Sequence, residues 1–156
     1  MNPVNIVDGS AYLEEIRALI LEYTRSLRLD LSFQGLEEEL AHLEDHYLPP
    51  NGALLAVRTE QGRIIGCVAL RRHSSLRCEM KRLYVKPGYQ GLGVGQLLAE
   101  GIIALAKEQG YGEMVLDTLS TMHSAIALYR KLGFSETEAY YENPFEDALY
   151  LRLTLS

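Results

Sequence analysis

The chain has 156 residues, the usual size of one domain, and a domain of this length buries roughly two-thirds of its unfolded surface. Its 47% hydrophobic and 23% charged residues are typical of a globular protein and argue against a disordered or fibrous one. The net charge of −6 lacks the basic excess needed for binding a phosphate backbone. We therefore expect one domain over residues 1–156, with no nucleic-acid partner.

The sequence predicts a cytoplasmic protein that does not enter a membrane. It begins MNPVNIVDGS, without a cationic segment followed by an apolar one, and no run reaches the roughly 18 apolar residues of a membrane span. Cys67 and Cys78 stand singly in strand-like runs, so we interpret both as small core residues in a reducing compartment. The four histidines are not at metal-ligand spacing, so no metal is predicted.

The first fifty residues predict one short strand and two helices. The strand covers residues 4–7, and Gly9-Ser10 then offers a cap for an amphipathic helix that ends near Leu27. A second helix is predicted over residues 36–43, and Pro49-Pro50 prevents its continuation.

The rest of the chain predicts strands joined first by a hairpin and then by helices. Two β-rich runs meet at Gln61-Gly62, and a third run covers residues 77–85. A glycine-rich stretch then opens a helix that ends near Gly110, and EMVLDT and MHSAIALYRKLGF predict a strand and a helix. Two strands complete the predicted order, and FEDALYLRLTL alternates in strand fashion. The strand–helix–strand order implies that residues 77–85 and 114–118 pair in parallel in a mixed sheet, with ligands beyond their carboxyl ends.

The stretch YQGLGVGQLL carries the most specific local signal. A Walker A loop would end in Gly-Lys-Ser/Thr, whereas this one has Gly95-Gln96-Leu97. A dinucleotide fingerprint that began at Gly91 or Gly93 would place its third glycine on Gln96 or Leu98. The remaining pattern is Q-x-x-G-x-G at the start of a helix, which predicts either an anion cradle of backbone N–H groups or a turn without a ligand.

This pattern, after a strand ending in LYV, resembles motif A of the GCN5-related N-acetyltransferases (GNAT), and AIALYRKLGF is similar to the family segment A-x-x-L-Y-x-x-x-G-F. The resemblance implies an α/β (α+β) fold with a mixed, central, splayed sheet of about seven strands and about four flanking helices. It implies that the loop binds the pyrophosphate of acetyl-CoA and that the preceding strand binds the pantetheine arm. The implied coenzyme-binding residues are Leu83, Tyr84, Val85, Gln90, Gly91, Leu92, Gly93, Val94, Gly95 and Gln96.

Three residues are candidates for the chemistry of acetyl transfer. Tyr129 matches the family tyrosine that is proposed to protonate the leaving thiolate, and the alternative is a core aromatic residue. Glu79 and Asp117 both stand where family members carry a general base, and each is alternatively a solvent-exposed or ion-paired carboxylate. Strand alternation places Glu79 on the face opposite Met80, Arg82 and Tyr84 unless a bulge interrupts it.

The resemblance further implies an acceptor pocket opposite the coenzyme. Aromatic rings and a carboxylate would suit a small amine, although the second group of candidates is alternatively a packed turn. The candidates are Asp30, Phe33 and Gln34 in one group and Tyr140, Tyr141 and Asn143 in the other.

We therefore expect an acetyl-CoA-dependent N-acetyltransferase that acts on a small-molecule or peptide amine by direct attack in a ternary complex. The alternatives are a non-catalytic acyl-CoA-binding module on the same fold and, less well supported, a nucleotide-binding domain. The acidic net charge favours a cationic acceptor through long-range steering. Family members commonly pair through their last strands, so a homodimer is one option for the oligomeric state.

Overall fold

A computed structural model describes residues 4–27, 35–143 and 145–155 of the chain, and its strands form one seven-stranded mixed sheet in the order β1-β2-β3-β4-β5-β7-β6. The strands are β1 Val4–Asp8, β2 Gly52–Thr59, β3 Ile64–Arg72, β4 Arg77–Val85, β5 Glu113–Leu119, β6 Ser135–Glu136 and β7 Ala148–Thr154. The helices are a 3-10 turn η1 Gly9–Tyr12, α1 Leu13–Leu27, α2 Leu36–Ala41, α3 Leu43–Tyr47, α4 Val94–Glu108 and α5 His123–Lys131.

The predicted fold class and element order are confirmed, with one helix divided into two. The segment predicted as a single helix over residues 36–43 forms α2 and α3, because His42 between them leaves the helical conformation, with φ −135° and ψ 52°. Five α-helices therefore lie within the described ranges, where the sequence predicted about four. The predicted hairpin is confirmed, with Gly62 at φ +83° in the turn between β2 and β3.

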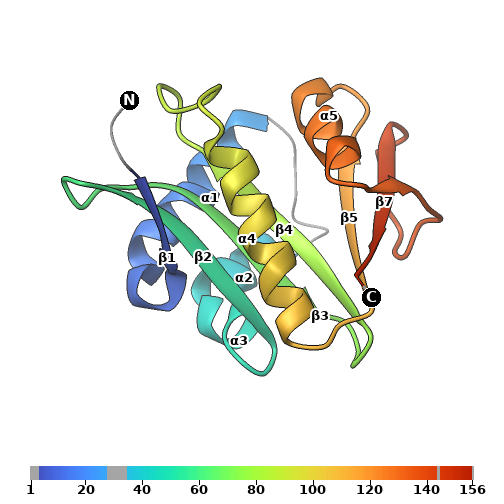
Figure 1. Ribbon diagram of the computed structural model, residues 1–156. Helices are drawn as coiled ribbons and strands as arrows, with labels where there is room; N and C mark the ends of the chain where they lie inside the picture. Colours follow the sequence, from blue (N-terminus) through green and yellow to red (C-terminus); the bar gives the residue numbers. More distant parts are fainter. Residues whose placement is uncertain (1–3, 28–34, 144, 156) are drawn as a thin grey trace.

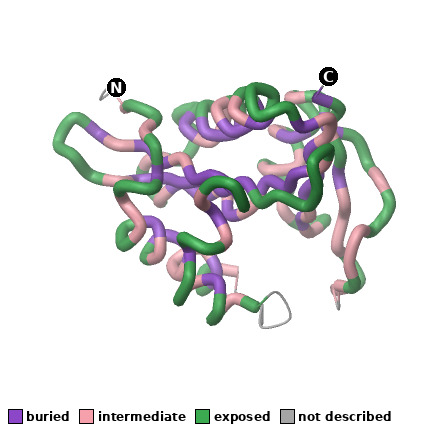
Figure 2. The backbone as a smooth tube through the Cα atoms, turned by 90° about the horizontal axis from the view of Figure 1, so that it is seen from below, coloured by how far each residue is buried: buried purple, intermediate pink, exposed green. Residues whose placement is uncertain are grey.

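Helices cover both faces of the sheet (Figure 1). On one face, α4 and α5 pack on a core that includes Leu98, Ile102 and Tyr129, and on the other face α1 and α3 pack on a core that includes Ile16 and Tyr47. Figure 2 shows the buried residues running along the central strands between these layers, with the outer helix faces exposed. The buried side chains of the sheet therefore belong to two separate hydrophobic cores, one on each face.

Strand β4 contains a break in its alternation. The β3–β4 register shifts between Cys67 and Ala69, and Arg82 on the opposite strand has a left-handed φ of 59°. Met80 therefore packs with α4, whereas Tyr84 packs with α1 in the other core. Regular alternation would place Met80, Arg82 and Tyr84 on one face, and this prediction is wrong. The bulge that the sequence analysis allowed for is present and interrupts the alternation.

Strands β4 and β5 run parallel but separate soon after they meet. Their pairing covers only Arg77↔Glu113, Cys78↔Met114 and Glu79↔Val115, although both strands continue beyond these positions. The predicted parallel pair and the splay of the sheet are therefore confirmed. The separation leaves space between the carboxyl ends of the two strands.

Some predicted core positions differ in exposure. Cys67 and Cys78 are buried free thiols, as predicted, whereas Leu97 on α4 is 46% exposed. Leu97 lies outside the arc of the helix that the buried residues occupy, which are Val94, Leu98, Ala99, Ile102, Ile103 and Ala106. None of the helices in the described ranges combines the length and the apolar character needed to cross a bilayer.

Candidate active site

A cavity of about 120 Å³ occupies the space between the diverging ends of β4 and β5. Strand β4 contributes one wall, β5 another, and α1 and α5 contribute residues at the sides. The lining residues are Tyr23, Leu27, Met80, Lys81, Arg82, Leu83, Leu116, Asp117, Thr118, Leu119, Met122, Ala125, Tyr129, Asn143 and Phe145. Two of the three predicted catalytic residues, Asp117 and Tyr129, therefore share one cavity.

Asp117 is a partly buried carboxylate on the wall of this cavity. Burial raises the pKa of Asp117, the hydrogen bond from the Tyr141 hydroxyl opposes that rise, and the negative charge of Glu79 adds to it. A carboxylate with a raised pKa binds a proton more readily than an exposed one, which suits a general base.

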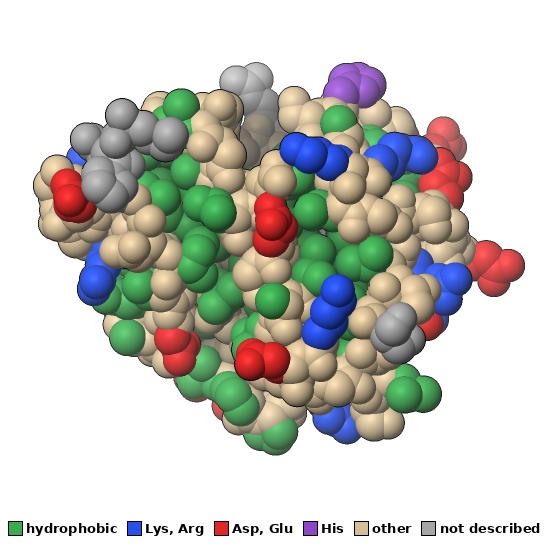
Figure 3. All heavy atoms as spheres, viewed as in Figure 1, with side chains coloured by type: hydrophobic (Ala, Val, Ile, Leu, Met, Phe, Trp, Pro, Cys, Tyr) green, Lys and Arg blue, Asp and Glu red, His purple; other side chains and the backbone are tan. Residues whose placement is uncertain are grey.

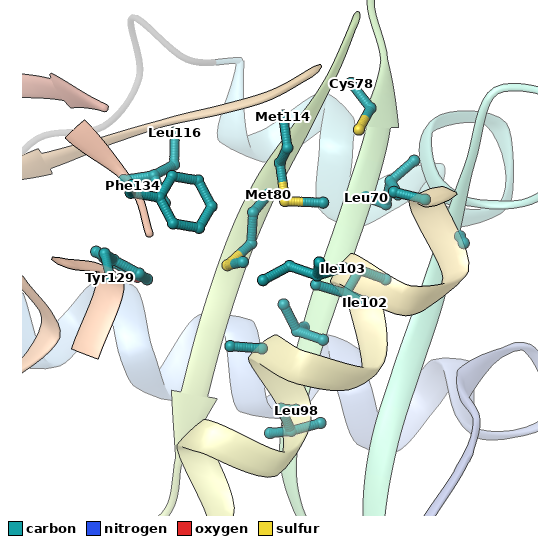
Figure 4. Packing of buried hydrophobic residues seen from close by; sticks show 14 of the residues in the cluster. Leu70, Cys78, Met80, Leu98, Ile102, Ile103, Met114, Leu116, Tyr129 and Phe134 are labelled. Atoms are coloured by element: carbon teal, nitrogen blue, oxygen red, sulfur yellow. The ribbon is translucent and has the colours of Figure 1, made fainter. Parts of the chain in front are cut away.

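Tyr129 is held in the cavity wall by the packing of α5. Its side chain is only 8% exposed, and its ring meets Phe134 edge-on with centroids 5.8 Å apart. Met80 and Met114 lie between this aromatic pair and the α4 residues (Figure 4). Burial raises the pKa of Tyr129, with further contributions from Tyr23 and Asp117, so its phenol stays protonated at neutral pH. Tyr129 is thus a core aromatic residue that also lines the cavity, and its role as the acid stays a prediction.

Glu79 occupies a different environment from Asp117. It is 3% exposed and accepts hydrogen bonds from His73 Nε2 at 2.8 Å and from the Tyr140 hydroxyl at 2.9 Å. Burial alone would raise the pKa of Glu79, but these hydrogen bonds and the nearby charge of Lys81 outweigh it and lower that pKa. Both carboxylate oxygens therefore have partners, and Glu79 is poorly suited to accept a further proton.

Glu79 lines a second, more open groove of about 440 Å³ beside the cavity. The groove residues are Arg71, Arg72, His73, Glu79, Lys81, Tyr140 and Tyr141. Lys81 lines both the groove and the cavity, and Tyr141 in the groove donates to Asp117 in the cavity. The two spaces are therefore neighbours that share side chains.

The glycine-rich loop before α4 has the geometry of an anion cradle. Gly91 and Gly93 have φ of +79° and +83°, and a Cβ at either position would meet no atom within 4 Å. The first hydrogen bond of α4 runs from Leu97 N–H to the Gly93 carbonyl, so the N–H groups of the first helical turn remain available to a ligand. The loop thus presents open backbone donors, and these residues fit the pyrophosphate group that the resemblance implies.

Side-chain hydrogen bonds fix the glycine-rich loop and the elements on either side of it, β4 and α4. Gln90 Nε2 donates to the Val85 carbonyl at 2.8 Å, which ties the loop to the end of β4. Lys131 Nζ donates to Gln96 Oε1 at 3.0 Å, which ties the start of α4 to the end of α5. The Tyr84 hydroxyl donates to Glu22 of α1 at 2.5 Å. The Gln90–Val85 bond therefore holds predicted coenzyme-binding residues of the loop and of β4 together, while the other two contacts fix α4 and β4 to neighbouring helices.

The predicted acceptor residues are only partly described. Asp30, Phe33 and Gln34 lie outside the described residues. Tyr140 and Tyr141 donate to Glu79 and Asp117 respectively, and their rings pack with centroids 5.4 Å apart. Asn143 lines the cavity and donates to the Tyr141 hydroxyl. The segment is therefore both a packed turn and part of the cavity.

Sequence reasoning missed two features of the site. One is the contact of His73, an exposed residue whose ring hydrogen-bonds the buried Glu79. The other is the ion pair between Arg82 of the bulge and Glu39 of α2. The His73–Glu79 contact joins residues six positions apart and the Arg82–Glu39 pair joins residues 43 positions apart, so neither follows from a local sequence pattern.

The structure also holds a group of potential metal ligands away from these spaces. His42, Glu44 and Asp45 are exposed around the start of α3, with ligand atoms within 4.8 Å of one another, and they line neither the cavity nor the groove. The absence of a metal therefore stays a prediction.

Comparison with known proteins identifies the family of this chain. The family model described as acetyltransferase (GNAT) family matches residues 13–134, which include the glycine-rich loop, Asp117 and Tyr129. The chain belongs to the GNAT family. An uncharacterised N-acetyltransferase of Schizosaccharomyces pombe is 43% identical to this GNAT chain, and the match covers 100% of the chain and 99% of that protein.

Two solved structures extend the comparison. A GNAT acetyltransferase from Staphylococcus aureus superposes with a TM-score of 0.81 at 25% identity, over 99% of this chain and 100% of that one. A GNAT acetyltransferase from Elizabethkingia anophelis, solved with acetyl-CoA bound, superposes with a TM-score of 0.60 at 27% identity. That match covers 73% of this chain and 82% of the bacterial chain. The resemblance to GNAT proteins drawn from the two sequence motifs is therefore confirmed.

Proposed function

We propose that this GNAT protein transfers an acetyl group from acetyl-CoA to a primary amine by direct attack in a ternary complex. The observation that carries the proposal is the cavity between β4 and β5, which has Asp117 and Tyr129 on its lining. The bound acetyl-CoA of the Elizabethkingia relative supports the choice of donor.

The loop and the end of β4 bind and orient the donor in this proposal. The N–H groups around Gly91 and Gly93 receive the pyrophosphate, and the unpaired edge of β4 near Leu83 receives the pantetheine arm. Acetyl-CoA supplies an acyl group already activated as a thioester. Backbone N–H groups at this edge stabilise the negative charge that develops on the carbonyl oxygen during attack.

Asp117 and Tyr129 move the protons. The amine nitrogen forms a bond to the acyl carbon as the carbon–sulfur bond breaks, so the nitrogen must lose a proton and the sulfur must gain one. Asp117, whose pKa is raised by burial, accepts the proton, directly or through a water. Tyr129, whose phenol is kept protonated by burial, donates to the sulfur. Glu79 positions Tyr140 and His73 and does not act as the base.

The experiment measures CoA release and N-acetyl product by mass spectrometry across amines, amino acids and peptides, with the wild type and three variants. We expect D117N and Y129F to lower kcat about a hundredfold or more, since positioned acids and bases contribute 10²–10⁴-fold. E79Q should retain more activity than D117N. Coenzyme binding without turnover of any acceptor would instead support the non-catalytic acyl-CoA-binding module, and full activity of D117N and Y129F would remove both assigned roles.

A further inference from the structure

The groove beside the cavity is basic in an otherwise acidic protein. Residues 71–82 contain five of the 15 basic residues of the chain and one of its 21 acidic residues. Three of those five basic residues, Arg71, Arg72 and Lys81, line the groove, where the single carboxylate is Glu79. The local charge is therefore opposite in sign to the net charge of −6.

Arg71 and Arg72 differ from the other basic residues of the segment in having no carboxylate partner among the described residues, whereas Lys81 lies 4.0 Å from Glu79. Arg77 pairs with Glu113 at 2.7 Å and Arg82 pairs with Glu39 at 2.9 Å. Across the described ranges, by contrast, no carboxylate comes within ion-pair distance of Arg71 or Arg72, although Arg71 lies directly opposite Glu79 in the β3–β4 register. Glu79 is bound instead by His73 and Tyr140. Glu79 can balance one positive charge of the groove, which leaves two arginines without a carboxylate partner among the described residues.

Lys81 has the most restricted position of the three. Its side chain is 9% exposed, and its ammonium lies 4.0 Å from the nearest Glu79 oxygen, beyond hydrogen-bonding distance. It donates no hydrogen bond to any of the residues that the structure describes, although an ammonium carries three donors. A largely buried cation without hydrogen-bond partners is costly, and an anionic oxygen placed in the groove would satisfy it.

We infer that the acceptor is a primary amine that also carries an anionic group, and that this anion binds Arg71, Arg72 and Lys81. This inference rests on the proposed function, because it names the substrate class of the same site. Since Lys81 lines both spaces and Tyr141 connects the groove to Asp117, one small molecule can place its amine in the cavity and its anion in the groove. The local charge, and not the acidic net charge that favoured a cationic acceptor, then sets the specificity.

The first test compares pairs of acceptors with and without an anionic group. Glutamate is paired with its diamide, and an amino-sugar phosphate with the free amino sugar, while a diamine represents cationic acceptors. We expect kcat/KM to be at least tenfold higher for the anionic member of one pair, and the pair that responds identifies the anion as carboxylate or phosphate. Equal rates within both pairs, or a preference for the diamine, would overturn the inference while leaving amine acetylation established.

The second test removes the cations singly. R71Q and R72Q should each raise KM for the anionic acceptor roughly tenfold, the loss expected for a hydrogen bond to a charged group, with kcat and the neutral acceptor unaffected. R63Q is the matched control, because Arg63 precedes the opposite end of β3 and lines neither space. In R72E the added negative charge should raise kcat/KM for the diamine relative to that for the anionic acceptor.

The two proposals fail in different ways. An unchanged ratio between anionic and neutral acceptors in R71Q, R72Q and R72E would overturn the anionic acceptor alone. Coenzyme binding without acetylation of any acceptor would overturn the proposed function, and this inference with it.

Discussion

The buried ion pair beneath the cavity offers a sharp test of the structure. Arg82 Nε and Nη2 each donate to a Glu39 oxygen at 2.9 Å, and the two side chains are 6% and 4% exposed. In R82M the chain keeps a long side chain at the same left-handed φ, so the backbone strain is unchanged, but Glu39 loses both charged donors. Removing one partner of a buried pair costs about 3–5 kcal/mol, a large fraction of the roughly 5–15 kcal/mol that holds a domain folded.

The same pair predicts how this loss depends on pH. Burial would raise the pKa of Glu39, but the hydrogen bonds and charge of Arg82 outweigh it, so the pKa lies below that of an ordinary glutamate. The pair therefore stabilises the wild type fully above the unfolded-state pKa of about 4.3, and this contribution is lost as the pH falls through the lower folded-state value. In R82M, Glu39 has lost its arginine partner and takes up a proton more easily. The difference in the free energy of unfolding between the wild type and R82M therefore becomes smaller as the pH falls.

Urea unfolding followed by far-UV circular dichroism at neutral and acidic pH measures these differences. R130M is the control, because the Arg130–Glu136 pair is 3.4 Å long and more than half exposed at both ends, and such pairs contribute about 0–1 kcal/mol. The double variant E39L/R82M should regain much of the stability lost in R82M, since no charge stays buried. An R82M loss no greater than that of R130M would refute the reasoning.

Three further predictions concern the cavity and the loop. Wild-type kcat/KM should fall on acidification through a pKa above the usual aspartate value of about 3.9, because Asp117 must be deprotonated to act, and D117N should lose this step in the pH–rate profile. Y129F should unfold within about 0.5 kcal/mol of the wild type, because its ring keeps the edge-on contact with Phe134. Gly93 and Gly110 have φ of +83° and +87°, and a Cβ at either position would meet open space. G93A and G110A should therefore each lose about 1–2 kcal/mol of stability in the urea assay. Calorimetry should show weaker acetyl-CoA binding only in G93A.

Local sequence patterns predicted most of the fold because they determine local structure directly. The Gln61-Gly62 turn, the helix after the glycine-rich loop and the parallel pair of strands all follow from periodicity and turn residues within short windows. The errors arose where the backbone of a single residue departs from the conformation of its neighbours. His42 divides a predicted helix and Arg82 interrupts strand alternation, and neither residue type signals an unusual conformation in advance.

The conformation of the glycine-rich loop was predictable from the sequence. Glycine spacing predicted an open turn at the start of α4, because few other residues adopt the positive φ found at Gly91 and Gly93. The side-chain network was less accessible, since Tyr140 reaches Glu79 from 61 residues away and Tyr141 reaches Asp117 from 24. Burial and such partners together set the direction in which the pKa of each carboxylate shifts, and both become known only when the strands are assembled.

The point at which β4 and β5 separate explains why two similar carboxylates have different environments. Glu79 belongs to the last paired position, opposite Val115, where the strands are still joined and neighbouring side chains enclose it. Asp117 lies two residues farther along β5, where β4 no longer pairs with it and the cavity opens. The sequence shows an acidic residue on each strand but not their relative register, so it leaves the general base undecided. The splay that opens the cavity is also what places Asp117, and not Glu79, on its lining.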